Sequence, residues 1–195
     1  LDDYSDFGRH ASPRLGLVYR PQEDSAIKLL YGQAFRAPSA VELGCADPDE
    51  PCRLPAGLQS DPYLKQVRAT SLEAGLRWAP APGHRLELSL YRNDNRDDIL
   101  FSSVSTTGQL GYFRNFDRTR HQGLDLSWQG RVGALDLALA YGRLDATYQA
   151  EGVLRIGERN LAVQPGMRIA GLPRQSLKFS ADWRVAAGWS VGADL

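Results

Sequence analysis

Apolar and polar residues alternate along many separate segments of this sequence, and few folds accommodate that pattern. In SLEAGLRW, residues 71–78, every second residue from Leu72 to Trp78 is apolar, whereas Glu73 and Arg77 fall between them. A β-strand turns successive side chains to opposite faces, but an α-helix repeats every 3.6 residues. The alternation therefore predicts strands that each have one apolar and one polar face. The same period recurs in residues 86–90, 124–128, 135–141 and 177–183.

About eight strands are expected from these segments and from similar ones near the start of the chain. Their predicted ranges are 12–20, 26–36, 68–78, 85–103, 110–128, 134–148, 173–184 and 189–195. The short connections are residues 21–25, 79–84, 129–133 and 185–188, and the longest connections are 37–67 and 149–172. Short and longer connections alternate, which predicts an antiparallel up-and-down meander with the short turns at one end.

A soluble β-sandwich alternates in the same way, so the choice between it and a membrane barrel depends on two further features. The predicted strands 85–103 and 110–128 are much longer than usual, and they suit strands that cross a bilayer and continue beyond it. An aromatic residue also lies beside every short turn, as membrane interfaces favour. These residues are Tyr19, Trp78, Trp128, Trp183 and Trp189. The sequence thus predicts an all-β fold, an antiparallel up-and-down transmembrane β-barrel.

The polar faces of the predicted strands would line the interior of such a barrel. Their charged residues are Glu73, Arg77, Glu87, Asp125, Asp136, Lys178 and Asp182. Because both signs are present, we expect a solvated wall whose charges neutralise one another rather than a binding site.

Composition excludes several other classes of protein. The chain has 23 Lys plus Arg and 23 Asp plus Glu, so no net positive charge attracts nucleic acid and we expect no nucleic-acid partner. No apolar run approaches the roughly 20 residues of a transmembrane helix. The sequence begins at Leu1 within an ongoing pattern, without a basic and apolar leader, which predicts a piece of a longer protein.

Both cysteines, Cys45 and Cys52, lie in the polar connection 37–67. Acidic residues between them suggest a metal site, but zinc sites use four ligands, usually Cys and His, and the three histidines are distant in sequence. A disulfide between the two cysteines is the favoured interpretation, and it implies an oxidising compartment. We expect no metal ion and no cofactor.

One motif is typical of enzymes. GWSVG, residues 188–192, matches G-x-S-x-G, in which Ser190 would be the nucleophile. A hydrolase places this serine between a strand and a helix, whereas here the motif opens a predicted strand. His121 and Asp125 share a face but lie about 13 Å apart along a strand, too far for a hydrogen bond. We therefore expect no enzymatic activity and no catalytic residue.

Three motifs, in this order, resemble the barrel of the TonB-dependent outer-membrane receptors. The first is Phe-Arg-Ala-Pro-Ser with a following Glu-Leu, in residues 35–43. The second is Asp-Pro-x-Leu-Lys at 61–65, and the third is Ser-x-Glu-x-Gly-x-Arg at 71–77. The resemblance covers about residues 12–195 and departs mildly from the family at residues 66–67, where Gln-Val replaces Pro-Glu.

This resemblance implies that the whole protein imports a scarce ligand, most often a ferric siderophore, across the outer membrane of a Gram-negative bacterium. Residues 1–195 would form part of the β-barrel domain, about eight strands of a larger barrel, without the plug domain. The implied partners are TonB, through an N-terminal segment outside this chain, the lipid bilayer and the small ligand. The alternative is a passive outer-membrane channel or a small closed barrel, because eight strands can close alone.

Ligand contacts are expected on outer loops and in the upper lumen. Arginine suits anionic chelates through planar bidentate donors, and tyrosine offers an amphipathic contact. The candidate residues are Arg36, Arg53, Tyr63 and Arg118. A Cys45–Cys52 disulfide would clip the first of these loops. Each candidate could equally serve only to cap or solvate a loop.

Overall fold

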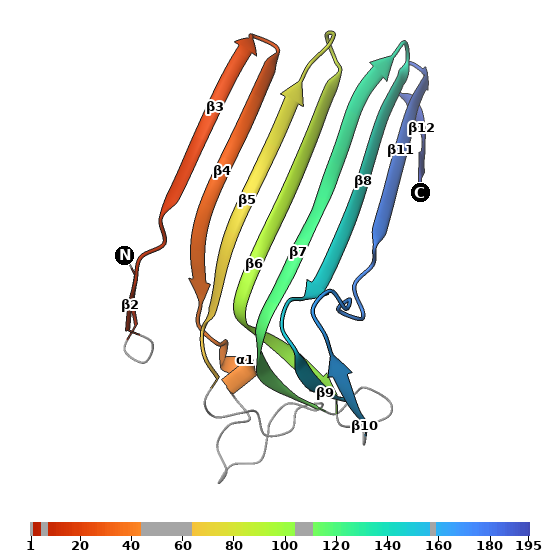
Figure 1. The fold of residues 1–195 in the computed structure, drawn as a ribbon. Helices are drawn as coiled ribbons and strands as arrows, with labels where there is room; N and C mark the ends of the chain where they lie inside the picture. Colours follow the sequence, from red (N-terminus) through yellow and green to blue (C-terminus); the bar gives the residue numbers. More distant parts are fainter. Residues whose placement is uncertain (1, 5–7, 44–63, 104–110, 157–158) are drawn as a thin grey trace.

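The computed structural model describes residues 2–4, 8–43, 64–103, 111–156 and 159–195. Most of them belong to one antiparallel sheet of eight strands, shown in Figure 1. Its strands are β3 (Arg14–Gln22), β4 (Ser25–Arg36), β5 (Val67–Trp78), β6 (Arg85–Ser103), β7 (Gly111–Val132), β8 (Leu135–Tyr148), β11 (Gln175–Ala186) and β12 (Trp189–Asp194). They pair in the order β3-β4-β5-β6-β7-β8-β11-β12, which is an up-and-down meander.

The predicted all-β antiparallel meander is confirmed, and the eight expected strands lie within a few residues of their predicted ends. The segment 149–172, expected as a loop, differs because it contains a hairpin of β9 (Gly152–Ile156) and β10 (Arg159–Val163). The remaining described elements are the short hairpin of β1 (Asp2–Tyr4) and β2 (Gly8–His10) and the one-turn helix α1 (Ala40–Leu43). Within the described residues, no helix has both the length and the apolar character to cross a membrane.

The two ends of the sheet differ in their connections. Short turns lie at one end, the top of Figure 1, which we call the turn end. The turn between β7 and β8 is only Gly133 and Ala134, and Gly133 has a φ of 60°, which glycine adopts without steric cost. β7 therefore runs to Val132, four residues beyond its predicted end. The opposite end, which we call the loop end, carries α1 and the β9–β10 hairpin.

The register places the large apolar side chains of the turn-end half on one face, the apolar face. Residues paired across neighbouring strands form a row, and one such row contains Trp78, Leu86, Trp128, Leu139 and Phe179. Alternate rows share a face, and the other face is called the polar face. Apolar-face side chains are widely exposed, for example Leu17 at 61% and Leu177 at 54%. An exposed apolar surface of this extent marks contact with lipid or with another protein.

Buried apolar residues gather instead at the loop end. One cluster consists of Phe116, Tyr148, Ala150 and Val163, and a second consists of Leu64, Val67 and Ile99. The first cluster includes a residue of β10, so the hairpin packs on the ends of β7 and β8. The long strands β6 and β7 thus pass from an exposed apolar half into a half with its own small core.

Candidate functional site

The aromatic residues that the sequence assigns to a membrane interface lie on the apolar face near the turn end. Trp78 and Trp128 share one row, Tyr19 lies two residues before that row, and Trp183 lies four residues beyond it. Barrel strands tilt by about 35–45°, so a level line moves by about one residue per strand. Six strand-to-strand steps separate Tyr19 from Trp183, which matches their offset. The rings share a level to within about two residues, as an interface belt requires.

Trp189 extends this belt to the last strand. It is the first residue of β12, beside the turn that follows β11, and it pairs with Ala186. Its side chain is 75% exposed, the largest exposed fraction among the belt aromatics. An indole ring in this position can place its apolar body in lipid and its N–H group in the polar interface. The interface role of the five aromatic residues remains a prediction that this geometry supports.

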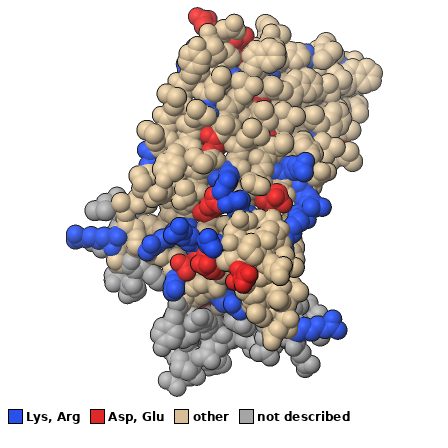
Figure 2. Space-filling view, in the orientation of Figure 1, with Lys and Arg blue, Asp and Glu red and all other residues tan. Residues whose placement is uncertain are grey.

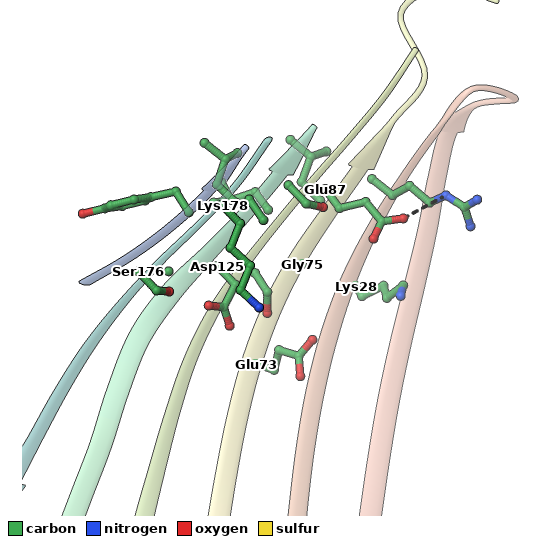
Figure 3. Close-up of a pocket in the computed structure, with 16 residues that line it drawn as sticks. Lys28, Glu73, Gly75, Glu87, Asp125, Ser176 and Lys178 are labelled. Carbon is green, nitrogen blue, oxygen red and sulfur yellow. Dashed lines mark ion pairs between the residues drawn. The ribbon is translucent and has the colours of Figure 1, made fainter. Parts of the chain in front are cut away.

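The polar face carries a shallow hollow of about 380 Å³. Figure 3 labels five of the charged side chains around it, Lys28, Glu73, Glu87, Asp125 and Lys178, and marks an ion pair of Glu87. In that pair, Arg77 Nε lies 3.6 Å from Glu87 Oε1, and both side chains are half exposed. Three carboxylates thus face three cations across the strands, in agreement with the expected neutral wall.

Glycines keep this wall recessed. A Cβ added at Gly142 would lie 2.9 Å from Ser176 Oγ, which is closer than real Cβ atoms come, and 3.0 Å from Asp125 Oδ1, which is a tight contact. Gly142 pairs with Asp125 on one side and Ser176 on the other. The small residue therefore leaves room for the carboxylate of Asp125 to lie along the wall rather than to project from it.

Near the turn end, the polar face holds Asp136 between two arginines. Its carboxylate lies 2.6 Å from Arg131 Nε and 3.3 Å from Arg184 Nη2. Asp136 is also the register partner of Asp182, and two carboxylates placed directly opposite each other repel. The two arginines offset that repulsion, so this part of the polar face is also neutralised internally.

The Phe-Arg-Ala-Pro-Ser motif forms the exit from β4 at the loop end. Pro38 has no N–H group to continue the ladder, and β4 ends at Arg36. Ser39 then caps α1 in a reciprocal capping box, because Glu42 N donates to Ser39 Oγ at 3.2 Å and Ser39 N donates to Glu42 Oε2 at 2.6 Å. Arg36 also donates to both carboxylate oxygens of Glu42, at 2.7 and 3.0 Å.

These contacts set the charge state of the Arg36–Glu42 pair. Burial acts to raise the pKa of the Glu42 carboxyl, but hydrogen bonds from Arg36 and Ser39 and the charge of Arg36 outweigh it, so the pKa lies below its ordinary value. The hydrogen bond to Glu42 holds the pKa of Arg36 above its ordinary value. Both groups are therefore ionised at neutral pH, and the pair fixes α1 to the end of β4.

Asn115 of β7 is a second anchor at the loop end, which sequence analysis did not identify. Its side-chain amide donates to Lys65 O at 2.9 Å and to Asp97 O at 2.7 Å, and its carbonyl accepts from Lys65 N at 2.7 Å. Asp97 interrupts the pairing of β6 with β7 without shifting the register, and it has a φ of 52°. No local pattern could have predicted this contact, because Lys65 lies 50 residues away in sequence.

The four candidate ligand-binding residues are placed differently from one another. Arg36 is hydrogen-bonded to Glu42. Arg53 and Tyr63 lie outside the described residues, as do Cys45 and Cys52. Arg118 departs from the expectation of a loop or upper-lumen position. It pairs with Arg96 in the register, which places it on the apolar face at the loop end, because ten residues separate it from Trp128 and strand faces repeat every two.

Arg118 belongs to a larger group of arginines on the apolar face, which we call the arginine band. Its members are Arg68, Arg92, Arg96, Arg118, Arg120 and Arg143. Figure 2 shows Lys and Arg side chains, with Asp and Glu side chains among them, gathered between the largely uncharged upper area of this face and the loop end. Four of the six residues line a hollow of about 900 Å³.

The structure does not give the G-x-S-x-G motif the setting of a hydrolase. Ser190 lies within β12, opposite Arg184 of β11, and not at a turn between a strand and a helix. Within the part of the chain that the structure describes, no group of three or more His, Cys, Asp and Glu side chains is placed to hold a metal ion.

Comparison with known proteins gives the same picture of the fold. Lactoferrin-binding protein A of Neisseria meningitidis serogroup A is 28% identical over 160 residues, which are 79% of this chain and 16% of that protein. The siderophore receptor PirA from Pseudomonas aeruginosa superposes with a TM-score of 0.69 at 17% identity, over 98% of this chain and 31% of that one. The siderophore receptor PiuA from Acinetobacter baumannii gives 0.66 at 17% identity, over 93% and 25%.

At these identities the solved structures show the fold alone, which is part of a larger transmembrane β-barrel. The chain spans less than a third of each of these relatives. The sequence model of the family described as TonB dependent receptor-like, beta-barrel, matches residues 1–195. Members of that family are outer-membrane proteins of Gram-negative bacteria, and they act as receptors and transporters rather than as enzymes. The chain belongs to the TonB-dependent receptor β-barrel family.

Proposed function

We propose that the protein to which this chain belongs imports a ferric siderophore or a similar small iron chelate through the outer membrane. The observation that carries the proposal is the match of the receptor-barrel family over all 195 residues. Siderophore receptors among the similar solved structures favour an iron chelate as the ligand. TonB is the proposed energy-coupling partner, acting through a segment outside this chain.

The role of the polar face in this proposal is that of a neutral lumen wall. Opposite charges sit on neighbouring strands, such as Arg77 and Glu87, so their fields cancel within about a Debye length, roughly 8 Å at physiological salt. A wall without net charge would not retain an anionic chelate by itself. Ligand selection is therefore assigned to the loops and not to this part of the barrel.

The anchors at the loop end support a ligand-binding role for residues 44–63. The Arg36–Glu42 pair fixes the chain just before this segment, and Asn115 fixes the backbone of Lys65 just after it. Two fixed ends limit the entropy that is lost when a segment orders on a ligand. We propose that Arg53 and Tyr63 contact the ligand and that a Cys45–Cys52 disulfide shortens the free part of this loop.

Uptake by the full-length receptor tests the proposal. A bacterium that lacks its own siderophore receptors would express the full-length gene under iron limitation and be supplied with ⁵⁵Fe-siderophores. We expect accumulation of at least one ferric siderophore in the presence of TonB and none in a strain without TonB. Equal uptake in both strains, together with leakage of small solutes, would identify a passive channel. Uptake of iron from lactoferrin alone would replace the small chelate by a protein ligand.

A further inference from the structure

The arginine band is a charged surface that the transport function does not use. Its six arginines occupy positions on the same face as the apolar residues of β5 to β8, turned away from the polar lumen wall. On these strands, the same rows of that face contain two acidic residues, Asp94 and Asp145. The chain as a whole has equal numbers of acidic and basic residues, so this local excess of positive charge is a matter of placement.

The position of the band matches the second interface of a membrane. Arg68 lies ten residues from Trp78 on β5, and the Arg96–Leu86 and Arg118–Trp128 spacings are the same. Ten residues extend about 33 Å along a strand, which is about 25 Å along the membrane normal for a strand tilted by about 40°. The apolar band of outer-membrane barrels is about 25 Å tall. Arg68, Arg96 and Arg118 therefore lie at the headgroup level opposite the aromatic belt.

The charges of the band are not satisfied within the described chain. Arg68, Arg96 and Arg118 follow one another in a single row, and like charges directly opposite each other repel. Asp94 is already shared by Arg92, at 2.7 Å, and Arg120, at 2.6 Å.

Little acidic charge remains for the row of three. Arg118 has an exposed contact at 3.5 Å with its own neighbour Asp117, and among the described residues Arg68 and Arg96 have no ion pair. All three side chains are exposed beside the hollow of about 900 Å³. A row of exposed guanidinium groups at one level needs anions from outside the chain.

We propose that the arginine band binds the phosphate groups of lipids in the outer leaflet of the outer membrane. Short turns of such barrels face the periplasm and longer loops face outward, so the band meets the outer leaflet. Guanidinium groups bind phosphate oxygens in a bidentate manner, and a row of three spaced by strand pairing can engage more than one phosphate of a headgroup. The apolar rows beside the band, such as that of Leu88 and Leu126, accommodate the acyl chains of the same lipid.

The test uses the full-length receptor in detergent and three variants with three substitutions each. The test variant carries Arg68→Gln, Arg96→Gln and Arg118→Gln, and a second variant carries Lys at the same three positions. The matched control carries Lys28→Gln, Arg77→Gln and Lys178→Gln, which remove three cations from the polar face. Resistance of the folded barrel to heat in SDS gels shows that each protein is folded. Native mass spectrometry measures bound lipid A, with its phosphates and after their enzymatic removal.

We expect the Gln variant to lose roughly tenfold or more of its lipid A affinity, because each basic residue near an anionic surface contributes several-fold. The Lys variant should lose less, and the polar-face control should bind like the unmodified receptor. Dephosphorylated lipid A should bind weakly to every protein.

Equal binding of lipid A to the unmodified receptor and the Gln variant would overturn the proposal. Full competition by millimolar inorganic phosphate would also overturn it, because the band would then be a site for free anions. The inference depends on the place of the barrel in the membrane and not on the transported ligand.

Discussion

β7 passes through two environments, and its two halves are stabilised in different ways. Near the turn end, Leu124, Leu126 and Trp128 follow one another on the apolar face, where lipid is their partner. Near the loop end, Phe116 is only 3% exposed, and the centroid of its ring lies 4.7 Å from the ring centroid of Tyr148. The same antiparallel ladder continues through both halves. One half therefore depends on the membrane and the other on contacts within the chain, and substitutions should separate the two.

The largest effect is expected from Phe116→Ala at the loop end. This change removes a buried ring, and the free energy of local unfolding should fall by about 3–5 kcal/mol. The ring lies directly against Gly152, because a Cβ added there would be 2.7 Å from Phe116 Cε2. Glycine has no side chain that could fill the space left by the ring. Hydrogen exchange of β9 and β10 in the full-length receptor measures the change. Phe101→Ala is the control, because Phe101 is 42% exposed and should matter less. Unchanged protection of the hairpin would refute this account of the core.

The turn-end half should respond to Leu126→Arg. A charge on the lipid face costs up to about 2–4 kcal/mol near the middle of the bilayer, and Leu126 lies within the apolar rows between Trp128 and the arginine band. Urea unfolding of the full-length receptor from phosphatidylcholine vesicles gives the free energy. Ser127→Arg is the matched control, because Ser127 faces the polar wall, and its cost should stay below about 1 kcal/mol. Equal costs at the two positions would mean that the faces are assigned wrongly.

The turn-end half could be predicted from sequence because lipid imposes a strict rule on it. Every second residue must be apolar there, so strands such as 71–78 and 177–183 can be recognised from their alternation. Aromatic residues mark the turn-end limit of each strand. The loop end obeys no such rule. The β9–β10 hairpin has strands of five residues, too short for a periodic pattern to identify, and its packing partner Phe116 lies far away in sequence.

The arginine band shows the same limit for a candidate site. Its members are scattered between residues 68 and 143, and each is unremarkable in its own strand. Only the register brings Arg68, Arg96 and Arg118 into one row, and a shift of one residue would move any of them to the polar wall. The register, which cannot be read from the sequence, likewise places Arg118 on the apolar face. Outside the apolar rows the residues on both faces are polar, so the sequence does not show to which face a polar side chain belongs.

Asn115→Ala should have an intermediate effect that is confined to the loop end. The substitution removes three hydrogen bonds of 2.7 to 2.9 Å, and leaving their backbone partners unpaired costs about 1–3 kcal/mol. Exchange of the Lys65 amide should become at least about tenfold faster, since about 1.4 kcal/mol corresponds to that factor. Asn93→Ala provides the comparison, because Asn93 lies on the polar face of β6 and pairs with His121 in the register. If both variants exchange alike at Lys65, Asn115 is not an anchor.

The smallest effect should come from acid at the Arg36–Glu42 pair. The pKa of Glu42 is lower in the folded protein than in the unfolded chain, so its stabilisation is complete above its ordinary pKa. It is then lost as the pH falls through the lowered folded value. The contribution should not exceed about 1 kcal/mol, because the Arg36 side chain is 49% exposed and solvent screens it.

Hydrogen exchange of Leu43, whose amide donates to Ser39 O, follows α1 between pH 7 and pH 3. After correction for the intrinsic rate, protection should fall in acid for the unmodified receptor and stay low throughout for Glu42→Gln. A profile that is flat and high in both proteins would show that α1 is held by the packing of Leu43 on the second core cluster and not by this ion pair.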